Sequence, residues 1–167
     1  MRIAHSAEIA QLFMIFLGTK KMSKKLRNRL SLILFSGDYD RVHYALAIAS
    51  AAASTNRPVT LFLAGGGLKL ILADIDKTPG WSQLRASENG KSPLEQDREN
   101  CENGIGTINE LLGACIHLDV TFYHCDMAVS ATGLADKKFR EDIPIKSGGL
   151  GSFLSETEKD GSQIVFI

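Results

Sequence analysis

The chain of 167 residues carries 19 basic and 19 acidic side chains, so its formal net charge is zero. This balance gives the whole chain no electrostatic attraction for nucleic acid, and we expect no nucleic-acid partner. A hydrophobic content of 44% and a charged content of 23% are typical of a globular domain that can bury its own core. The three cysteines lack the number and spacing of a disulfide framework, which favours a reducing cytoplasm.

Residues 9–17 (IAQLFMIFL) form the most apolar run near the beginning of the chain. The run is shorter than the roughly 20 residues of a membrane-spanning helix, and the basic cluster follows it, whereas a signal peptide has its basic residues first. We consider two interpretations. Residues 1–21 are a gene-start extension before a natural start at Met22, or they contain a short helix that packs on the domain or on a neighbouring subunit. We therefore divide the chain into an N-terminal extension (1–28) and one domain (29–167), and expect no membrane association.

A strand–helix–strand unit opens the domain. Residues 30–35 (LSLILF) and 59–63 (VTLFL) are nearly continuous apolar runs, as expected for strands buried on both faces. Between them, residues 41–54 carry apolar side chains at helical spacing, with many alanines that allow close packing on a sheet. A unit of this kind implies a right-handed crossover and a parallel sheet.

The middle of the domain is less regular. The turn at residues 64–67 (AGGG) is followed by a predicted helix over 68–75. Residues 76–103 form a long polar segment that contains Trp81, the single tryptophan. Polar segments of this length are typical of a lid, an interface arm or a disordered insertion.

The regular pattern then resumes. We predict a helix over 105–116, a strand over 118–123, a short helix over 127–133, an extended piece at 143–145, a helix over 150–159 and a strand over 163–167. Strands that alternate with helices predict one doubly wound α/β domain with a mostly parallel sheet of four to five strands.

Cys125 is the candidate reactive residue, because it follows a predicted strand and precedes a predicted helix. Open α/β sheets place their chemistry at this edge, and the amino terminus of a helix favours the thiolate. The alternative is a small apolar residue packed at the end of a strand. Asp126 either caps the following helix or raises the pKa of the thiol by its charge, and His124 should point to the opposite face.

The other cysteines have weaker claims to function. Cys115 lies on the apolar face of its predicted helix, which indicates a core residue. Cys101 falls in the polar segment and is expected to be exposed, as a resolving thiol, a second carrier site or a residue without function. A zinc site made of His124, Cys125 and Cys101 has no recognisable spacing, so we expect no metal.

Two further loops should lie at the same edge of the sheet as Cys125. One is the turn after the first strand, at residues 36–40, and the other is the AGGG turn. Backbone amides of the AGGG turn either bind an anion or simply connect a strand to a helix. The predicted pocket residues at this edge are Ser36, Gly37, Asp38, Gly65, Gly66, Asp126 and Met127.

Four stretches, taken in order, resemble the DsrE/DsrF-like family of sulfur-relay proteins, often labelled peroxiredoxin-like. They are LSLILFSGDYD, the alanine-rich helix, VTLFLAGGG and HCDMAVSATGL. The cysteine with methionine two residues later, then Gly-Leu, is similar to the signature of the DsrE-like branch, here Cys125, Met127, Gly133 and Leu134. The resemblance covers roughly residues 30–167, with 76–103 as an insertion or a divergent part.

The resemblance implies a three-layer α/β fold, assembly into trimers or hexamers, and a cysteine that carries sulfane sulfur as a persulfide. Cys125 would then accept sulfur from donor proteins or low-molecular-weight persulfides and pass it to an acceptor thiol, without any metal or other cofactor. One alternative is a non-catalytic oligomer of the same fold that binds a small ligand or a partner. A thiol peroxidase is a weaker alternative, because no Pro-x-x-x-Thr/Ser-x-x-Cys arrangement surrounds any cysteine.

Overall fold

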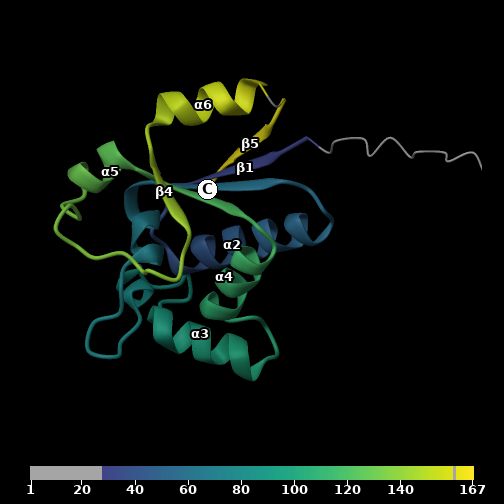
Figure 1. Ribbon diagram of the computed structural model, residues 1–167. Coiled ribbons are helices and arrows are strands. Elements are labelled where there is room, and N and C mark those ends of the chain that lie inside the picture. Colours follow the sequence, from purple (N-terminus) through teal and green to yellow (C-terminus); the bar gives the residue numbers. More distant parts are fainter. Residues whose placement is uncertain (1–27, 160) are drawn as a thin grey trace, which may run out of the picture.

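A single parallel sheet of five strands organises the computed structural model, which describes residues 28–159 and 161–167 (Figure 1). The strands are β1 (Leu30–Leu34), β2 (Val59–Leu63), β3 (Thr121–Cys125), β4 (Ile145–Gly148) and β5 (Gln163–Phe166). Their order across the sheet is β4-β3-β2-β1-β5, and every neighbouring pair is parallel. The predictions for the N-terminal extension concern residues 1–27, which lie outside the described residues.

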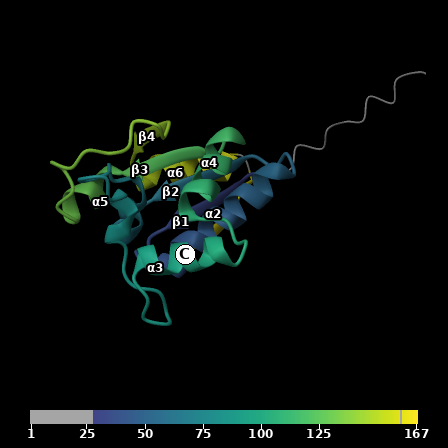
Figure 2. The ribbon, with the colours of Figure 1, turned by 90° about the horizontal axis from the view of Figure 1, so that it is seen from below.

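Helices cover the two faces of this sheet unequally. On one side lie α2 (Tyr39–Ser54), α3 (Pro93–Glu102) and α4 (Ile108–His117), and on the other side lies α6 (Leu150–Lys159) (Figures 1 and 2). The short helix α5 (Asp126–Ala131) follows β3 directly. The predicted doubly wound, three-layer α/β fold is therefore confirmed, with five parallel strands.

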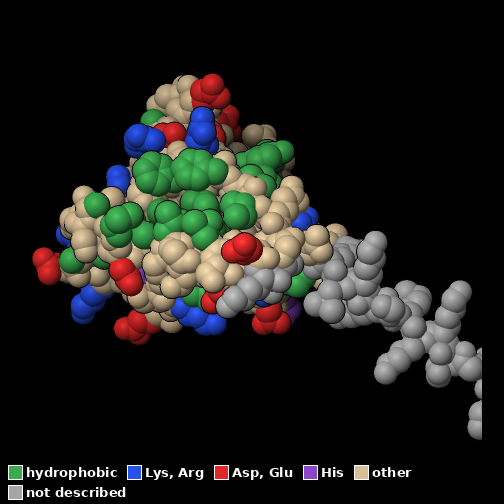
Figure 3. All heavy atoms as spheres, turned by 90° about the horizontal axis from the view of Figure 1, so that it is seen from above, with side chains coloured by type: hydrophobic (Ala, Val, Ile, Leu, Met, Phe, Trp, Pro, Cys, Tyr) green, Lys and Arg blue, Asp and Glu red, His purple; other side chains and the backbone are tan. Residues whose placement is uncertain are grey.

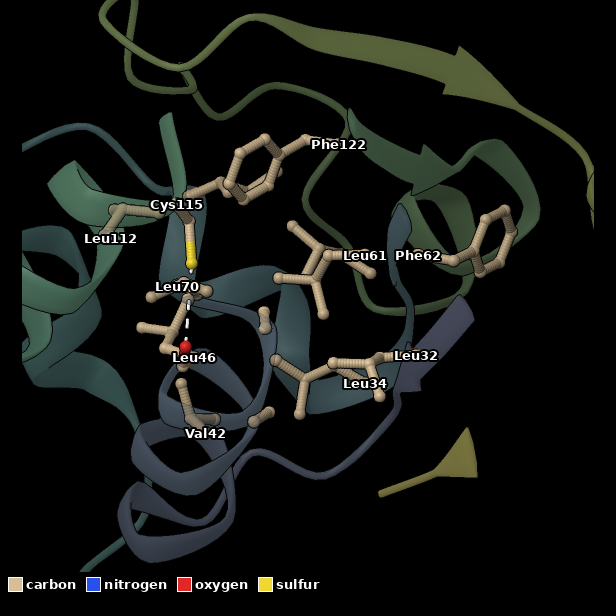
Figure 4. Close-up of a cluster of buried hydrophobic side chains, with 14 of the residues drawn as sticks. Leu32, Leu34, Val42, Leu46, Leu61, Phe62, Leu70, Leu112, Cys115 and Phe122 are labelled. Atoms are coloured by element: carbon tan, nitrogen blue, oxygen red, sulfur yellow. Dashed lines mark hydrogen bonds between the residues drawn. The ribbon is translucent and has the colours of Figure 1, made fainter. Parts of the chain in front are cut away.

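The core lies between the sheet and the helices α2 and α4. Leu32, Leu61 and Phe122 from three neighbouring strands are fully buried there (Figure 4). Cys115 of α4 is also fully buried, and its Sγ–H donates to the backbone carbonyl of Leu46 at 3.6 Å. Burial raises the pKa of the Cys115 thiol to about 12. The prediction that Cys115 is a core residue agrees with this environment.

The polar segment at residues 76–103 packs against the domain. It contains the 3₁₀ helix η2 (Gly80–Gln83), whose Trp81 is 2% exposed, and the helix α3. Ser92 begins α3 with a capping box, in which its side chain bonds the backbone of Glu95 and the Glu95 carboxylate bonds back. The segment therefore belongs to the folded domain, to which it contributes η2 and α3.

A buried polar cluster fixes α3 to α2. The Tyr39 hydroxyl donates to Asp97 at 2.7 Å and accepts from the Asn100 amide at 3.1 Å. The same Asp97 oxygen accepts the backbone N–H of Ile108, the first residue of α4. Burial, together with the hydrogen bond to Asp97, raises the pKa of Tyr39. Tyr39 thus links α2 to α3, and Asp97 links α3 to the start of α4. Every polar group named here has a hydrogen-bond partner, as burial requires.

Several predicted boundaries were wrong. The helix predicted over 68–75 is the 3₁₀ helix η1 (Gly65–Ile71), which begins at the glycines themselves. The strand predicted over 118–123 lies at Thr121–Cys125, so that Cys125 is its last residue. The extended piece at 143–145 is β4 (Ile145–Gly148), and the helix expected to begin at residue 105 begins at 108, after a capping box on Thr107.

The Tyr39→Phe variant tests the buried cluster. It removes a hydroxyl that satisfies both Asp97 and Asn100, so we expect unfolding to become easier by about 1–3 kcal/mol. Tyr44→Phe on the same helix is the matched control, because Tyr44 is 68% exposed. Urea denaturation followed by circular dichroism gives both values, and equal stability of the two variants would contradict the role of the cluster.

Candidate functional site

The candidate site is the edge of the sheet at which the parallel strands end. Because β1, β2 and β3 are neighbours and run in the same direction, they end at the same edge, where Leu34 pairs with Leu63, Leu63 pairs with His124, and Cys125 lies one residue beyond. Ligand sites of open α/β sheets are found outside such strand ends. The three loops that were predicted to meet here do begin at the same edge.

The loop after β1 contacts the turn after β2 through two glycines. A Cβ on Gly66 would lie 2.7 Å from the backbone nitrogen and Cα of Gly37, a distance that real Cβ atoms do not adopt. Gly65 has a φ of +48°, and a Cβ on it would lie 2.8 Å from the ring of Phe35. Gly66 is therefore needed for the close approach of the two turns, and Gly65 is needed for its positive φ and for the space beside Phe35.

Asp38 is held by its neighbours. Its backbone N–H and its carboxylate both bond the Ser36 hydroxyl, and Arg85 Nε donates to the carboxylate at 2.6 Å. Burial opposes ionisation, but the hydrogen bonds from Ser36 and Arg85 and the charges of Arg85 and Arg41 outweigh it and lower the pKa of Asp38. The Arg85 backbone N–H also donates to the Gly37 carbonyl at 2.7 Å. Arg85 thus fixes the loop after β1.

A hollow of about 260 Å³ lies beside Asp38. Asp38, Asp40, Arg41, Ala86 and Glu88 line it. Three carboxylates face one guanidinium there, so its lining favours a cationic ligand over an anion. The anion-binding role predicted for Ser36, Gly37 and Asp38 gains no electrostatic support from this hollow and stays a prediction.

Cys125 ends β3 and is the N-cap residue of α5. It pairs with Gly148 of β4, it is 3% exposed, and its sulfur makes no hydrogen bond within the described part of the chain. The helix that follows has only six residues, so its dipole is small, and stabilisation of a thiolate would depend on the first backbone amides. Cys125 is therefore a free, buried thiol at a strand-to-helix junction.

His124 lies on the other side of β3 from Cys125, because strand side chains alternate, and Asp126 bonds Ser147, the strand partner of His124. The Asp126 carboxylate accepts two contacts of 2.7 Å from the Ser147 hydroxyl, and no side-chain bond caps α5. His124 packs against Phe139, and its Nδ1 lies 3.4 Å from Asp126, within ion-pair distance but without hydrogen-bond geometry. The suggestion that Asp126 caps the helix was wrong, and His124 is a neighbour of the thiol on the opposite face.

The remaining predicted residues differ in exposure. Met127, on α5, is 70% exposed. Cys101 is also exposed, but it lies at the end of α3, which is distant in the sequence from the strand ends.

Within residues 28–159 and 161–167, no group of three histidine, cysteine or acidic side chains is arranged to hold a metal ion. None of the helices described in this part of the chain has the length and apolar character that crossing a bilayer requires.

Three residues of this edge were not predicted from the sequence. Arg85 binds Asp38 and Gly37, Ser147 binds Asp126, and Gly148 is the strand partner of Cys125. Each lies at least 20 positions from its partner along the chain, and none carries a motif. Only the folded topology brings them to the site.

The fold and the free thiol at the strand end define an α/β protein with a candidate reactive cysteine. Comparison with known proteins agrees with the fold. No family profile matches the chain. The uncharacterized protein YrkE of Bacillus subtilis is 25% identical over 157 residues, which cover 83% of this chain and 96% of that protein.

Two solved structures share the fold. A conserved protein of unknown function from Bacteroides thetaiotaomicron, BT1422, is 15% identical with a TM-score of 0.50, covering 84% of this chain and 95% of that one. The ychN protein from E. coli is 12% identical with a TM-score of 0.50, covering 83% and 99%. At these identities the likeness establishes the architecture, and the activity must be argued from the site.

The contact between the two turns can be tested by adding one methyl group. Gly66→Ala should cost about 1–3 kcal/mol of stability, because backbone atoms of Gly37 occupy the space. The matched control is Gly113→Ala in α4, where nothing lies within 4 Å and alanine should stabilise the helix by about 0.5–1 kcal/mol. Urea denaturation that shows no cost for Gly66→Ala would contradict the contact.

The three thiols should react in a fixed order. With a maleimide on the folded protein, we expect Cys101 first, Cys125 second and Cys115 last, because Cys101 is exposed, Cys125 lies at an edge, and Cys115 is fully buried with its pKa raised to about 12. Peptide mass spectrometry at successive times measures the order. Labelling of Cys115 before Cys125 would show that the strand end is less accessible than the core.

Proposed function

We propose that this protein carries sulfane sulfur as a persulfide on Cys125. The observation that carries the proposal is the position of a free thiol at the carboxyl end of β3, beside two glycine-lined turns. The resemblance of HCDMAVSATGL to the DsrE-like signature supports it, and with it membership of the DsrE/DsrF-like family. The same resemblance supports assembly into trimers or hexamers, and the number and spacing of the cysteines support a cytoplasmic location.

The chemistry requires one nucleophile. The Cys125 thiolate attacks the outer sulfur of a donor persulfide, a new S–S bond forms on Cys125, and the donor S–S bond breaks. The donor leaves as a thiolate, so electrons balance without an oxidant or a metal. An acceptor thiolate then attacks the outer sulfur on Cys125 and restores the thiol. The sulfur donor is therefore a persulfide and the acceptor is a thiol, each belonging to a protein or to a small molecule.

A sulfur donor must reach the Cys125 thiol past neighbouring residues that leave space around it. A Cβ on Gly148 would lie 3.1 Å from the Tyr123 ring, whereas nothing lies within 4 Å of where a Cβ of Gly149 would be, so the open side is at Gly149. On the other side, the six residues of α5 include Asp126 and Met127, both exposed. A helix of six residues with few buried side chains opens at low free energy, which would admit a donor sulfur to a thiol that is otherwise 3% exposed.

A second candidate function follows from that same burial. Cys125 belongs to the apolar cluster that includes Phe62 and Phe153, as expected for a cysteine that only packs. In that case the edge of the sheet would bind a small ligand or a partner without any thiol chemistry. The two functions differ in whether Cys125 takes up sulfur in the folded protein.

The test is treatment of the folded protein with inorganic polysulfide, followed by peptide mass spectrometry. We expect one added sulfur atom on the peptide that contains Cys125, in the parent chain and in the matched control Cys101→Ser. Cys125→Ser should lose this modification while keeping its circular dichroism spectrum. The added sulfur should pass to glutathione and leave Cys125 unmodified, since exchange between thiols is reversible.

Two outcomes would contradict sulfur carriage. Modification of Cys101 alone would identify a surface thiol without a role for the edge of the sheet. Modification of Cys125 only after unfolding in urea would show a packed residue and favour the second candidate.

A further inference from the structure

β5 is an edge strand of the sheet. It pairs with β1 on one side, and among the described residues no strand pairs with its other side. The backbone N–H groups of Gln163 and Ile167 both donate to carbonyls on the β1 side. Because backbone groups alternate in direction along a strand, the N–H and C=O groups of Ile164 and Phe166 point away from β1. Within the described part of the chain, these outward groups have no hydrogen-bond partner.

This outer edge of β5 lacks the features that usually prevent pairing with another strand. Such features are a charged side chain, a proline or a bulge. The other edge strand, β4, carries Lys146, whose ammonium lies 5.8 Å from the centre of the Tyr123 ring. β5 has the sequence QIVF and an unbroken register with β1, and its Ile164 and Phe166 are 44% and 67% exposed. β5 is therefore the edge that remains open to a further strand.

Ile164 and Phe166 project from the side of the sheet that α6 partly covers. Phe153 of α6 packs on Phe62 of β2, with ring centroids 4.6 Å apart. The strand register aligns Phe62 with Ile33 of β1, and Ile33 with Phe166. Ile164 shares this side, because it lies two residues from Phe166. Figure 3 views this side and shows hydrophobic side chains gathered across its middle.

A second copy of β5 complements the outer edge of β5. When two copies of β5 run antiparallel about a two-fold axis at Val165, Ile164 of each copy lies opposite Phe166 of the other. Directly opposed residues whose backbone groups face each other exchange both of their N–H···O bonds. All the outward groups of Ile164 and Phe166 then have partners, in both copies.

The side chains favour the same register. Opposed residues of antiparallel strands project from the same face, so each Ile164 packs beside the Phe166 ring of the other copy. An aromatic residue opposite a β-branched residue is a favourable cross-strand pair, and the two-fold axis forms this pair twice. β5 carries no charged side chain, so the arrangement brings no like charges together along the paired strands.

The helices leave room for the second copy. Strands lie about 4.8 Å apart, so the two copies of β1 would be about 14 Å apart. α2 packs against β1 and β2, and the axes of packed helices need about 8–10 Å, so the two α2 helices do not collide. The contact of Phe153 with Phe62 places α6 over β2, which is farther from the axis.

We propose that this protein pairs with a second copy of itself along β5, with Ile164 of each copy opposite Phe166 of the other. The two sheets then form one continuous sheet. Both copies use the same surface, so the contact joins two monomers into a dimer or two trimers into a hexamer. The proposal goes beyond sulfur carriage and does not depend on it, because it needs no reaction at Cys125.

Analytical ultracentrifugation of the full chain tests this contact. Short strands bury less than the about 1,200–2,000 Å² of a stable complex, so the molar mass should be followed from about 1 to 300 μM. We expect the mass to rise twofold across this range. Phe166→Lys should keep the lower mass throughout, because it places a charge at the paired edge. The matched control Tyr44→Lys replaces an aromatic ring of similar exposure on α2 and should behave as the parent chain.

A cross-link tests the register. Val165 would lie opposite its own copy as a non-hydrogen-bonded pair, with Cα atoms about 4.5 Å apart, and a disulfide joins Cα atoms about 4.4–6.8 Å apart. In a Cys101→Ser background, Val165→Cys should therefore join two chains on oxidation with diamide. Lys146→Cys, on the other edge strand, is the control and should not.

Three outcomes would overturn the proposal. The first is a parent chain whose mass stays that of a monomer or a trimer at every concentration. The second is an assembly whose mass Phe166→Lys leaves unchanged while circular dichroism shows the variant to be folded, because another surface then holds the copies together. The third is cross-linking through Lys146→Cys without cross-linking through Val165→Cys, which would place the contact at β4.

Discussion

The parallel register of the strands is the constraint on which the candidate site depends. Because β1, β2 and β3 run in one direction and pair without a bulge, three loops that are separated by up to about 90 positions begin at one edge. Close contact of Gly37 with Gly66, and the bond from Arg85 to the Gly37 carbonyl, then fix two of these loops against each other. Cys125 lies beside these loops because it is the last residue of β3, so no sequence motif is required to bring it there.

The same constraint explains what the sequence could predict. Residues 59–63 were predicted to the residue, because a continuous apolar run after Pro58 has few alternatives to a buried strand. Helix α3 was missed because its sequence, PLEQDRENCE, has no apolar stripe. Its stability comes from a capping box and from the buried contact of Asp97 with Tyr39, which is 58 positions away. Likewise, the carbonyl of Leu34 lies too close to Gly67 for any Cβ, a contact between the end of β1 and η1 that no local pattern reveals.

The chemistry of the site was predictable only in part. The position between a strand and a helix identified Cys125, but the exposure of a strand-end thiol depends on what packs around it, and here Cys125 is 3% exposed within the apolar cluster. Asp126 shows the limit clearly. The sequence left its side chain a choice between capping α5 and facing the thiol, whereas Ser147 of β4, 21 positions later, binds the carboxylate instead. The position of such a side chain depends on a hydrogen-bond partner from a segment that is distant in the sequence, and a single sequence does not reveal that partner.

Cys125 lies on the same side of the sheet as Phe62, which packs against Phe153 of α6, because Phe62 pairs with Tyr123 and side chains two residues apart in a strand share a face. The register continues one residue past its last pairs to place Phe35, Ala64 and Cys125 in one row, and alternation gives all three the side that α6 partly covers. In this row Ala64 stands between Phe35, which is 53% exposed, and Cys125, which is 3% exposed. Any element that packs on Phe35 therefore also narrows the approach to the thiol from that side.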